Sequence, residues 1–313
     1  MQANILGDIQ AWLFALLVYP GLLFGVAVAL GIEWLVGVIR PRLSPSVYRT
    51  APRPSHFLQP LFSFFSLAGR RGPVGLTPHT EQASKPGYEA LSYLTLAGAA
   101  APLLALALMP LGGNPVARSG IGQADVVVVL LLLALQPLSR SLARLLSGGP
   151  SSIEGTRPLG RLLTGLVPAL VVVAALVRVT GGDALDLATL GAAPETGWQF
   201  LVRLLAGITL LVTLPWWLDP STSEETAGSL IGRLLQTVAL GAFWTALILP
   251  RPGDLGWAIV LAVLGTFIAS FAIRFLPLLW TPLRPERDTA RFIWTAALPL
   301  ATLALLISLW TTA

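Results

Sequence analysis

The chain has no cysteine, only two histidines, His56 and His79, and a single lysine, Lys85. Without cysteine it can form no disulfide, has no thiolate nucleophile, and cannot ligate an iron–sulfur cluster or a zinc–thiolate site. Charged residues make up only 11% of the 313 residues, whereas an average soluble domain has roughly 25%. This shortage of polar surface excludes a water-soluble enzyme, a disordered protein and a secreted disulfide scaffold.

Apolar residues dominate: they account for 55% of the chain, and its mean hydropathy is +0.76. The basic groups are 19 arginines and one lysine against 15 acids, which gives a net charge of +5 and a pI near 10.4. In a soluble protein such a pI would indicate a nucleic-acid partner. In a chain this apolar, arginines at the membrane surface are the simpler explanation, so we expect an integral membrane protein that binds no nucleic acid.

Eight apolar runs are long enough to span a bilayer. They cover residues 10–39, 91–112, 124–146, 162–179, 198–218, 229–249, 256–281 and 290–312. A helix needs about 20 apolar residues to cross roughly 30 Å of hydrocarbon, and unpaired backbone groups exclude most other spanning structures. We therefore predict an all-α, polytopic membrane helix bundle of about eight transmembrane helices, forming one domain over residues 1–313. The first run is long enough to be tilted or to continue beyond the bilayer.

Basic residues gather in the odd-numbered loops. The first loop, at 40–90, holds six arginines and Lys85, the third holds Arg157 and Arg161, and the seventh is similarly basic. The positive-inside rule then makes the odd loops cytoplasmic and leaves both termini outside. The N-terminus lacks a positive segment and a cleavage site, so we expect no cleaved signal peptide. The abundance of Ala, Leu, Arg, Gly and Pro favours a prokaryotic source, which implies the plasma membrane.

The first loop is the long polar segment of the chain. Residues 40–62 interleave four arginines with five prolines, and Phe57–Leu67 reads as a short amphipathic helix at the interface. Proline prevents regular helix, so we expect a stiff, extended, cationic loop. Such a loop could dock a partner with acidic groups or bind anionic lipid headgroups. The ordinary alternative is that its arginines only fix the orientation of the protein in the membrane and bind no specific partner. The proline density favours docking.

Enzyme motifs are missing. The sequence has no G-x-x-x-x-G-K-[ST] loop, no H-E-x-x-H pair and no D-D-x-x-D aspartates. His56 and His79 lie 23 residues apart in the polar loop without a nearby carboxylate pair, and one metal ion needs three or four ligands. We therefore interpret them as interfacial loop residues and predict no metal site.

The remaining candidates are charges in or near the spans, because an ionisable group in lipid costs several kcal/mol (about 2.5–3.5 on insertion scales). They are Glu33, Asp125, Arg203, Arg233 and Arg274. A misplaced helix end or an arginine that reaches the headgroups is the preferred explanation for all of them except Glu33, which has apolar neighbours on both sides. Three of the spans contain no acid, so the chain alone is poorly equipped to pass protons.

Several short motifs follow one another in a recognisable order. They are Arg49-Thr50-Ala51-Pro52, Leu58-Gln59-Pro60-Leu61, Met109-Pro110-Leu111-Gly112, Gln123-Ala124-Asp125, the segment from Pro150 through Glu154 to Arg157, Leu214-Pro215 followed by Asp219, Glu224 and Glu225, and Arg287-Asp288-x-x-Arg291. With eight spans and a long arginine-rich first loop, the chain resembles membrane subunit 1 of respiratory complex I. It is equally similar to the counterpart in group 4 membrane-bound nickel–iron hydrogenases and formate hydrogenlyase.

The resemblance covers nearly the whole chain and implies a role. It implies a non-catalytic membrane anchor and coupling subunit of an oxidoreductase complex that translocates protons or sodium. The partners would be an iron–sulfur small subunit, a large catalytic subunit, antiporter-like membrane subunits and membrane lipids. The chain itself would bind no cofactor, while the partners would hold iron–sulfur clusters and a nickel–iron site or quinone.

Two sets of residues follow from the resemblance. Six of the first loop would lie close to the partner subunit or a quinone: Arg40, Arg42, Arg49, Arg53, Gln59 and Pro60. Seven are candidates for a coupling path between the redox site and ion movement: Glu33, Asp125, Glu154, Arg157, Asp219, Glu224 and Glu225.

The chain also departs from the family pattern. Pro158 follows Arg157 where a glutamate is usual, and Trp217 stands at the aspartate of the L-P-F-D element if that loop is aligned without gaps. Phe62-Ser63-Phe64-Phe65-Ser66 replaces the polar pattern after Gln-Pro. In the family these carboxylates and a lysine link the redox site to the proton path. The resemblance, with these losses, implies a divergent relative whose role is to anchor the soluble redox arm and connect it to antiporter-like pumping subunits.

Two other functions compete with this one. A stand-alone transporter or channel usually shows internal repeats and interrupted helices. No repeat is evident, although Pro137, Pro168 and Pro277 could interrupt helices. An intramembrane lipid enzyme is the third hypothesis, and it lacks a catalytic constellation.

Overall fold

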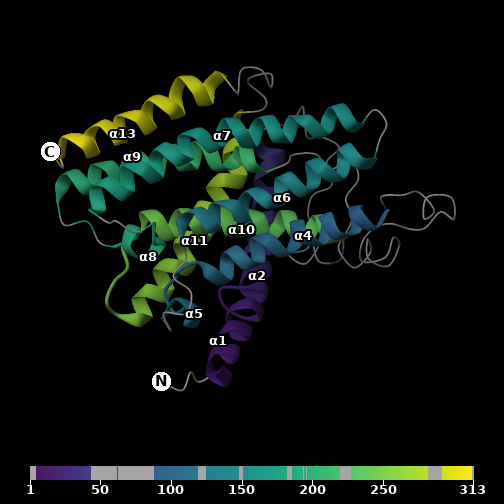
Figure 1. The fold of residues 1–313 in the computed structure, drawn as a ribbon, viewed down its shortest axis with the longest axis horizontal. Helices are drawn as coiled ribbons and strands as arrows, with labels where there is room; N and C mark the ends of the chain where they lie inside the picture. Colours follow the sequence, from purple (N-terminus) through teal and green to yellow (C-terminus); the bar gives the residue numbers. More distant parts are fainter. Residues whose placement is uncertain are drawn as a thin grey trace.

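The computed structural model describes residues 5–43, 62, 88–118, 125–147, 151–181, 185–192, 194, 196–218, 227–280 and 291–311, and every regular element in these ranges is helical (Figure 1). The elements are α1 (Ile5–Leu17), α2 (Leu22–Leu43), α4 (Tyr88–Leu108), α5 (Pro115–Arg118), α6 (Val126–Ser147), α7 (Ser151–Thr180), α8 (Leu187–Leu190), α9 (Gly197–Thr213), the 3-10 turn η1 (Leu214–Trp217), α10 (Ala227–Ile248), α11 (Leu255–Trp280), the π-helical turn η2 (Ile293–Ala297) and α13 (Leu298–Thr311).

These helices fit a bilayer. Within the described ranges, seven segments are long and apolar enough to cross a membrane, and α4 adds a shorter apolar stretch, Leu96–Leu108. The seven are Gly7–Arg40, Val126–Ala143, Leu159–Thr180, Gly197–Trp217, Leu230–Ile248, Leu255–Leu279 and Ile293–Trp310. They coincide with the apolar runs of the sequence, so the prediction of an all-α, multi-pass membrane bundle is confirmed.

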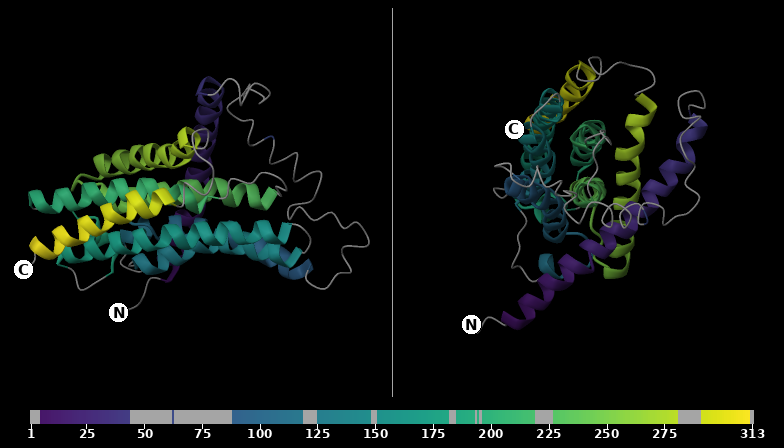
Figure 2. Two further views of the ribbon diagram at one scale, coloured as in Figure 1. Left: turned by 90° about the horizontal axis from the view of Figure 1, so that it is seen from above. Right: turned by 90° about the vertical axis from the view of Figure 1, so that its right-hand side faces the viewer.

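Helices α4, α6, α7, α9, α10 and α13 run back and forth along the long axis of the molecule, and α1 and α2 cross that axis (Figures 1 and 2). We call the end where α9 begins and α13 ends the terminal end, and the opposite end, where α4 begins and α6 ends, the loop end. The aromatic residues Trp198, Trp257 and Trp310 are exposed near the terminal end. Exposed tryptophans at helix ends are typical of a membrane–water interface.

The first span differs from its prediction as one helix. It is broken between α1 and α2 at Tyr19-Pro20-Gly21, and it crosses the other helices steeply in the right-hand view of Figure 2. Pro20 has no N–H for a helical hydrogen bond. A side chain at Gly21 would collide with the carbonyl groups of Ala15 and Leu16. Tyr19 Oη donates to the Gly112 carbonyl at 2.9 Å, which attaches the break to the turn after α4.

Two predicted loop boundaries are wrong. Arg40 and Arg42 belong to α2, which passes through Pro41 and ends at Leu43, and Arg157 and Arg161 lie in α7, not in the third loop. Hydropathy marks only the part of a helix that lies in lipid, whereas backbone hydrogen bonds continue the helix into the aqueous layer. The boundary between the first span and the first loop therefore lies no earlier than Leu43.

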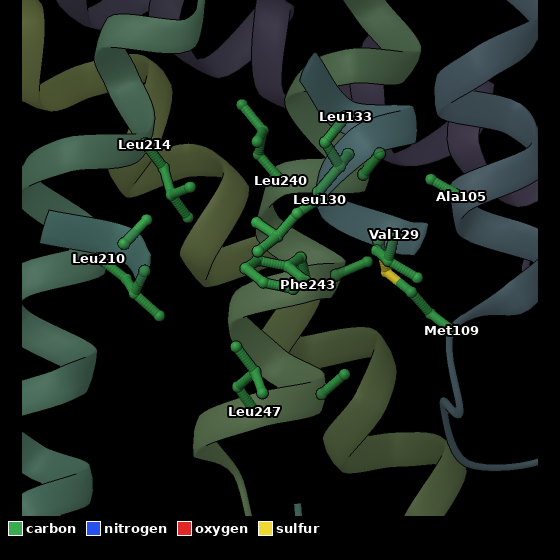
Figure 3. Packing of buried hydrophobic residues seen from close by; sticks show 14 of the residues in the cluster. Ala105, Met109, Val129, Leu130, Leu133, Leu210, Leu214, Leu240, Phe243 and Leu247 are labelled. Atoms are coloured by element: carbon green, nitrogen blue, oxygen red, sulfur yellow. The ribbon is translucent and has the colours of Figure 1, made fainter. Parts of the chain in front are cut away.

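The bundle is organised around α10. In its segment Leu230–Ile248, 83% of residues are buried inside the protein, against 28% for the last span. It packs against α2, α4, α6, α9 and α11. Phe243 lies at the centre of this core, with Leu130 and Val129 of α6 and Met109 after α4 around it (Figure 3). A central helix explains why α10 is apolar on all its faces.

Small residues let the helices approach α10 closely. A side chain at Gly241 would collide with Ser270 of α11, and one at Gly265 would meet Thr245. Likewise Gly232 packs on the backbone of Gly98 in α4. Close approach at small residues is the usual packing mode in membranes, where lipid is as apolar as the helix surface and van der Waals contact must hold helices together.

A buried glutamine connects α10 to a proline in α6. Pro137 cannot donate to the carbonyl of Leu133, four residues before it. Gln236, which is fully buried, donates its Nε2 to that carbonyl at 2.8 Å. The side chain thus satisfies a backbone group that would otherwise lack a partner in the membrane. Pro137, Pro168 and Pro277 all lie inside continuous helices, so none interrupts its span as a transporter would require.

Replacing Gln236 with leucine should lower the stability of the bundle. The Leu133 carbonyl would lose its donor, at a cost of about 1–2 kcal/mol. In the double variant Gln236→Leu with Pro137→Ala, the backbone N–H at 137 would supply the donor and recover most of the loss. Thermal unfolding of the purified protein in detergent measures both effects. A double variant less stable than Gln236→Leu alone would contradict this account.

Gly241→Ala should destabilise the bundle by about 1–3 kcal/mol, because the added methyl group forces α10 away from Ser270. Gly160→Ala in α7 is the matched control, since a side chain there meets nothing within 4 Å. It should be neutral or stabilising by up to about 1 kcal/mol through helix propensity. The same unfolding measurement applies, and equal effects of the two changes would contradict the packing argument.

Candidate functional site

An ion pair joins two spans, α2 and α11. Arg274 of α11 donates its Nε to Oε1 of Glu33 in α2 at 2.9 Å, across 241 positions of sequence. The two side chains are 22% and 21% exposed, in that order. The sequence marked Glu33 and Arg274 separately, and the fold brings them together because α2 and α11 pack against each other.

The pair lies inside the spans. Glu33 precedes the end of its segment at Arg40 by seven residues, and Arg274 precedes Leu279 by five. At a rise of about 1.5 Å per residue, each lies roughly 7–10 Å along its own helix from the end of its apolar segment. Pairing offsets the high cost of each charge there. About a fifth of each side chain stays uncovered, so a group outside this chain can reach it.

Two other intramembrane arginines are buried, which overturns their interpretation as side chains reaching the headgroups. Arg233 of α10 is 8% exposed and Arg203 of α9 is 4% exposed. Hydropathy windows cannot distinguish a buried arginine from one that reaches the surface, because both interrupt an apolar run in the same way. Arg203 Nη2 donates to the carbonyl of Leu190 at 2.9 Å, while its Nε and Nη1 have no hydrogen-bond partner among the described residues.

Asp125 caps a helix at the terminal end. Its Oδ1 accepts from Val127 N at 2.7 Å, at the first turn of α6. Its backbone pairs with that of Asp186, and Val126 N donates to the Leu185 carbonyl at 2.8 Å. Asp125 therefore stands at the N-terminal end of its helix as a cap, a role the sequence analysis did not predict.

Most other predicted site residues cannot be placed. Glu154 and Arg157 lie in the first turns of α7, but their side chains are outside what the structure describes. Arg40 is exposed at the end of α2, and Arg42 follows it. The rest lie outside the described residues: Arg49, Arg53, Gln59, Pro60, Asp219, Glu224 and Glu225. So does the predicted interfacial helix Phe57–Leu67, apart from Phe62, which is exposed.

Trp217 occupies the position where the family resemblance expects an aspartate. It lies in η1 and is only 1% exposed. Its indole packs on α7 at Gly165, whose missing side chain would lie 2.7 Å from the indole Nε1. A packed indole therefore stands in place of the carboxylate.

Sequence reasoning missed a polar cluster at the terminal end. Asp186 caps α8 by accepting from Ala188 N and Thr189 N. At the other end of α8, Arg203 binds the Leu190 carbonyl and Arg251 binds those of Leu187 and Ala188. The Asp-x-x-Thr capping pattern at 186–189 was the available signal. The positions of both arginines depend on the fold.

Burial shifts the acid–base behaviour of Arg251. Desolvation lowers its pKa to about 10, with Asp186 acting in the opposite direction and Arg203 adding to the decrease. The pKa stays above neutral, so the side chain is cationic at physiological pH.

No family model matches the chain, and no curated protein matches it. Among solved structures it is similar to a chain in the structure of the membrane-bound sulfane sulfur reductase, an archaeal respiratory membrane complex. The TM-score is 0.69, with 18% identity, over 96% of this chain and 99% of that one. At this identity the likeness is one of fold. The protein is a multi-pass membrane protein that shares, over nearly its full length, the fold of a chain from a respiratory membrane complex.

Neutralising one member of the Glu33–Arg274 pair should destabilise the bundle more than neutralising both. Glu33→Gln leaves a guanidinium without its carboxylate inside the membrane, at a cost of about 1–3 kcal/mol. Adding Arg274→Gln removes that charge and should restore at least half of the loss. Thermal unfolding measures the effect. Additive losses in the double variant would contradict the coupling.

Proposed function

We propose that this protein is the membrane anchor and coupling subunit of a redox-driven, ion-translocating complex of the complex I or membrane-hydrogenase type. It would link a soluble electron-transfer arm to antiporter-like membrane subunits. The observation that carries the proposal is the likeness to a chain of an archaeal respiratory membrane complex across 96% of this chain and 99% of the other. The motif order of the sequence supports the same class.

The loop end is the proposed seat for the soluble arm. Arginines with exposed or half-buried side chains occur in that half of the bundle: Arg40, Arg140, Arg161 and Arg291. Arg40 is exposed where α2 leaves the membrane, and the residues that follow carry Arg42, Arg49 and Arg53. A cationic surface favours partners with acidic groups, here the iron–sulfur small subunit and the large catalytic subunit.

The Glu33–Arg274 pair is the proposed coupling element within this chain. It joins the first span to the seventh. An ion pair in low dielectric has two discrete arrangements, in contact and separated. A change of charge in a neighbouring subunit can shift the equilibrium between them. Trp217 stands where the family resemblance expects a carboxylate. We therefore propose that this chain couples to its partners through charge interactions and packing contacts between subunits. The antiporter-like partners would conduct the ion.

The redox cofactors belong to the partners in this proposal. The chain has no cysteine, so it offers no thiolate ligand for an iron–sulfur cluster. Iron–sulfur clusters and a nickel–iron site or quinone would lie in the partner subunits or against the first loop. Membrane lipids would contact the remaining surface of this chain.

Purification through a tag on this chain should recover a hydrogenase-like or complex I-like soluble arm together with antiporter-like subunits, identified by mass spectrometry. The combined variant Arg40→Gln, Arg42→Gln, Arg49→Gln and Arg53→Gln should lose the soluble subunits and keep the membrane ones. Arg178→Gln, exposed at the terminal end, is the control and should keep all of them. A chain that purifies alone and carries a solute across liposomes would instead establish the stand-alone transporter.

A further inference from the structure

A pocket of about 230 Å³ opens at the terminal end, opposite the proposed seat for the soluble arm. Three segments far apart in sequence form it: the turn 110–114 after α4, Ala188 of α8, and residues 251–258 between α10 and α11. Since one water occupies about 30 Å³ in the liquid, the pocket has room for a group of several heavy atoms. Tyr19, Gly112 and Asn114 hold the turn in place through hydrogen bonds.

Arg251 is the charged side chain in the pocket wall. Its Nη2 donates to the carbonyls of Leu187 at 2.9 Å and Ala246 at 3.3 Å, and its Nη1 donates to that of Ala188 at 3.3 Å. A guanidinium has five N–H donors. Two of them, on Nε and Nη1, are left for a further acceptor, and the three carbonyl contacts hold the group in a fixed orientation.

The positive charge of Arg251 is not neutralised by contact with a carboxylate of the described residues. Its three hydrogen bonds all go to backbone carbonyls. The nearest acid acting on it, Asp186, accepts hydrogen bonds from the N-terminus of α8, and Asp254 accepts from Trp257 N at 3.0 Å. Behind Arg251, the buried Arg203 adds a second positive charge that contacts a carbonyl.

The pocket also lies beside the end of a membrane-spanning segment, Leu255–Leu279. It adjoins the first turn of α11, where Trp257 is 64% exposed at the end of a membrane span. Tryptophan at such a position marks the membrane–water interface. A fixed guanidinium with spare donors prefers a phosphate oxygen over other acceptors because its fork matches two oxygens at once.

We propose that this pocket binds a phosphate group through Arg251, supplied by the headgroup of an anionic lipid or by free phosphate. The site is separate from the first loop and from the Glu33–Arg274 pair, so it does not depend on the proposed coupling role. In either case the anion would attach the turn after α4, α8 and the α10–α11 connection to one another.

The test uses the full chain, purified with whatever partners it retains, in nanodiscs of phosphatidylcholine with or without phosphatidylglycerol. Native mass spectrometry measures the phosphatidylglycerol kept per chain. Thermal unfolding in phosphatidylcholine alone, with and without inorganic phosphate, measures the response to a soluble anion.

Gly253 offers a matched pair of variants, because it lines the pocket and a side chain there meets nothing within 4 Å. Gly253→Glu places a competing carboxylate beside Arg251, while Gly253→Gln adds the same bulk without charge. Arg251→Gln removes the cation but also its contacts to α8, so the Gly253 pair keeps the test valid if that variant fails to fold. Arg161→Gln makes the same charge change at the loop end.

We expect the wild-type protein, Gly253→Gln and Arg161→Gln to retain phosphatidylglycerol. Gly253→Glu and Arg251→Gln should retain about tenfold less. A tenfold decrease corresponds to the loss of one charge-assisted hydrogen bond. This result would assign the site to a lipid headgroup. Stabilisation by inorganic phosphate that is lost in Gly253→Glu, without lipid retention, would assign it to a free anion. Equal retention in all variants together with no phosphate response would overturn the proposal.

Discussion

The constraint on which this structure depends is that backbone polar groups inside a membrane must find their partners within the protein. Along a helix the backbone groups bind one another. At the breaks and ends named below, a side chain supplies the missing partner. Gln236 reaches the Leu133 carbonyl that Pro137 leaves without a donor. Arg203 and Arg251 take the carbonyls of the short helix α8, and Asn114 takes those of Ala107 and Met109 at the end of α4. Several polar side chains of the described residues thus serve backbone groups at helix breaks and ends.

The same constraint explains the position of α10. A central helix contacted by six others has little surface left for lipid, so its polar side chains must find partners inside the bundle. The Nε2 of Gln236 does so in α6, and Trp244 Nε1 donates to the Gly207 carbonyl of α9 at 2.8 Å. Small residues such as Gly241 bring the neighbouring backbones within reach. Packing and hydrogen bonding thus support each other around one helix, and a change at either disturbs both.

The two ends of the bundle differ in their chemistry. The loop end has the exposed Arg40, which suits an acidic partner on the aqueous side. The terminal end has two arginines held by helix carbonyls around a pocket beside the end of a membrane-spanning segment. In the proposed complex the first end would receive the redox arm and the second would face the opposite leaflet.

The sequence by itself determined the spans, because burial in hydrocarbon selects apolar runs of about 20 residues regardless of which helices meet. It also marked Glu33, Asp125 and Arg274 as charges in unusual places, and the order of motifs indicated a class of complex. Only the tertiary structure decided that Glu33 meets Arg274, that Arg203 and Arg251 share the carbonyl groups of α8, and that Trp217 fills a position where a carboxylate was expected. These contacts join segments distant in sequence, and hydropathy is a sum over neighbours along the chain that contains no information on which helices lie side by side.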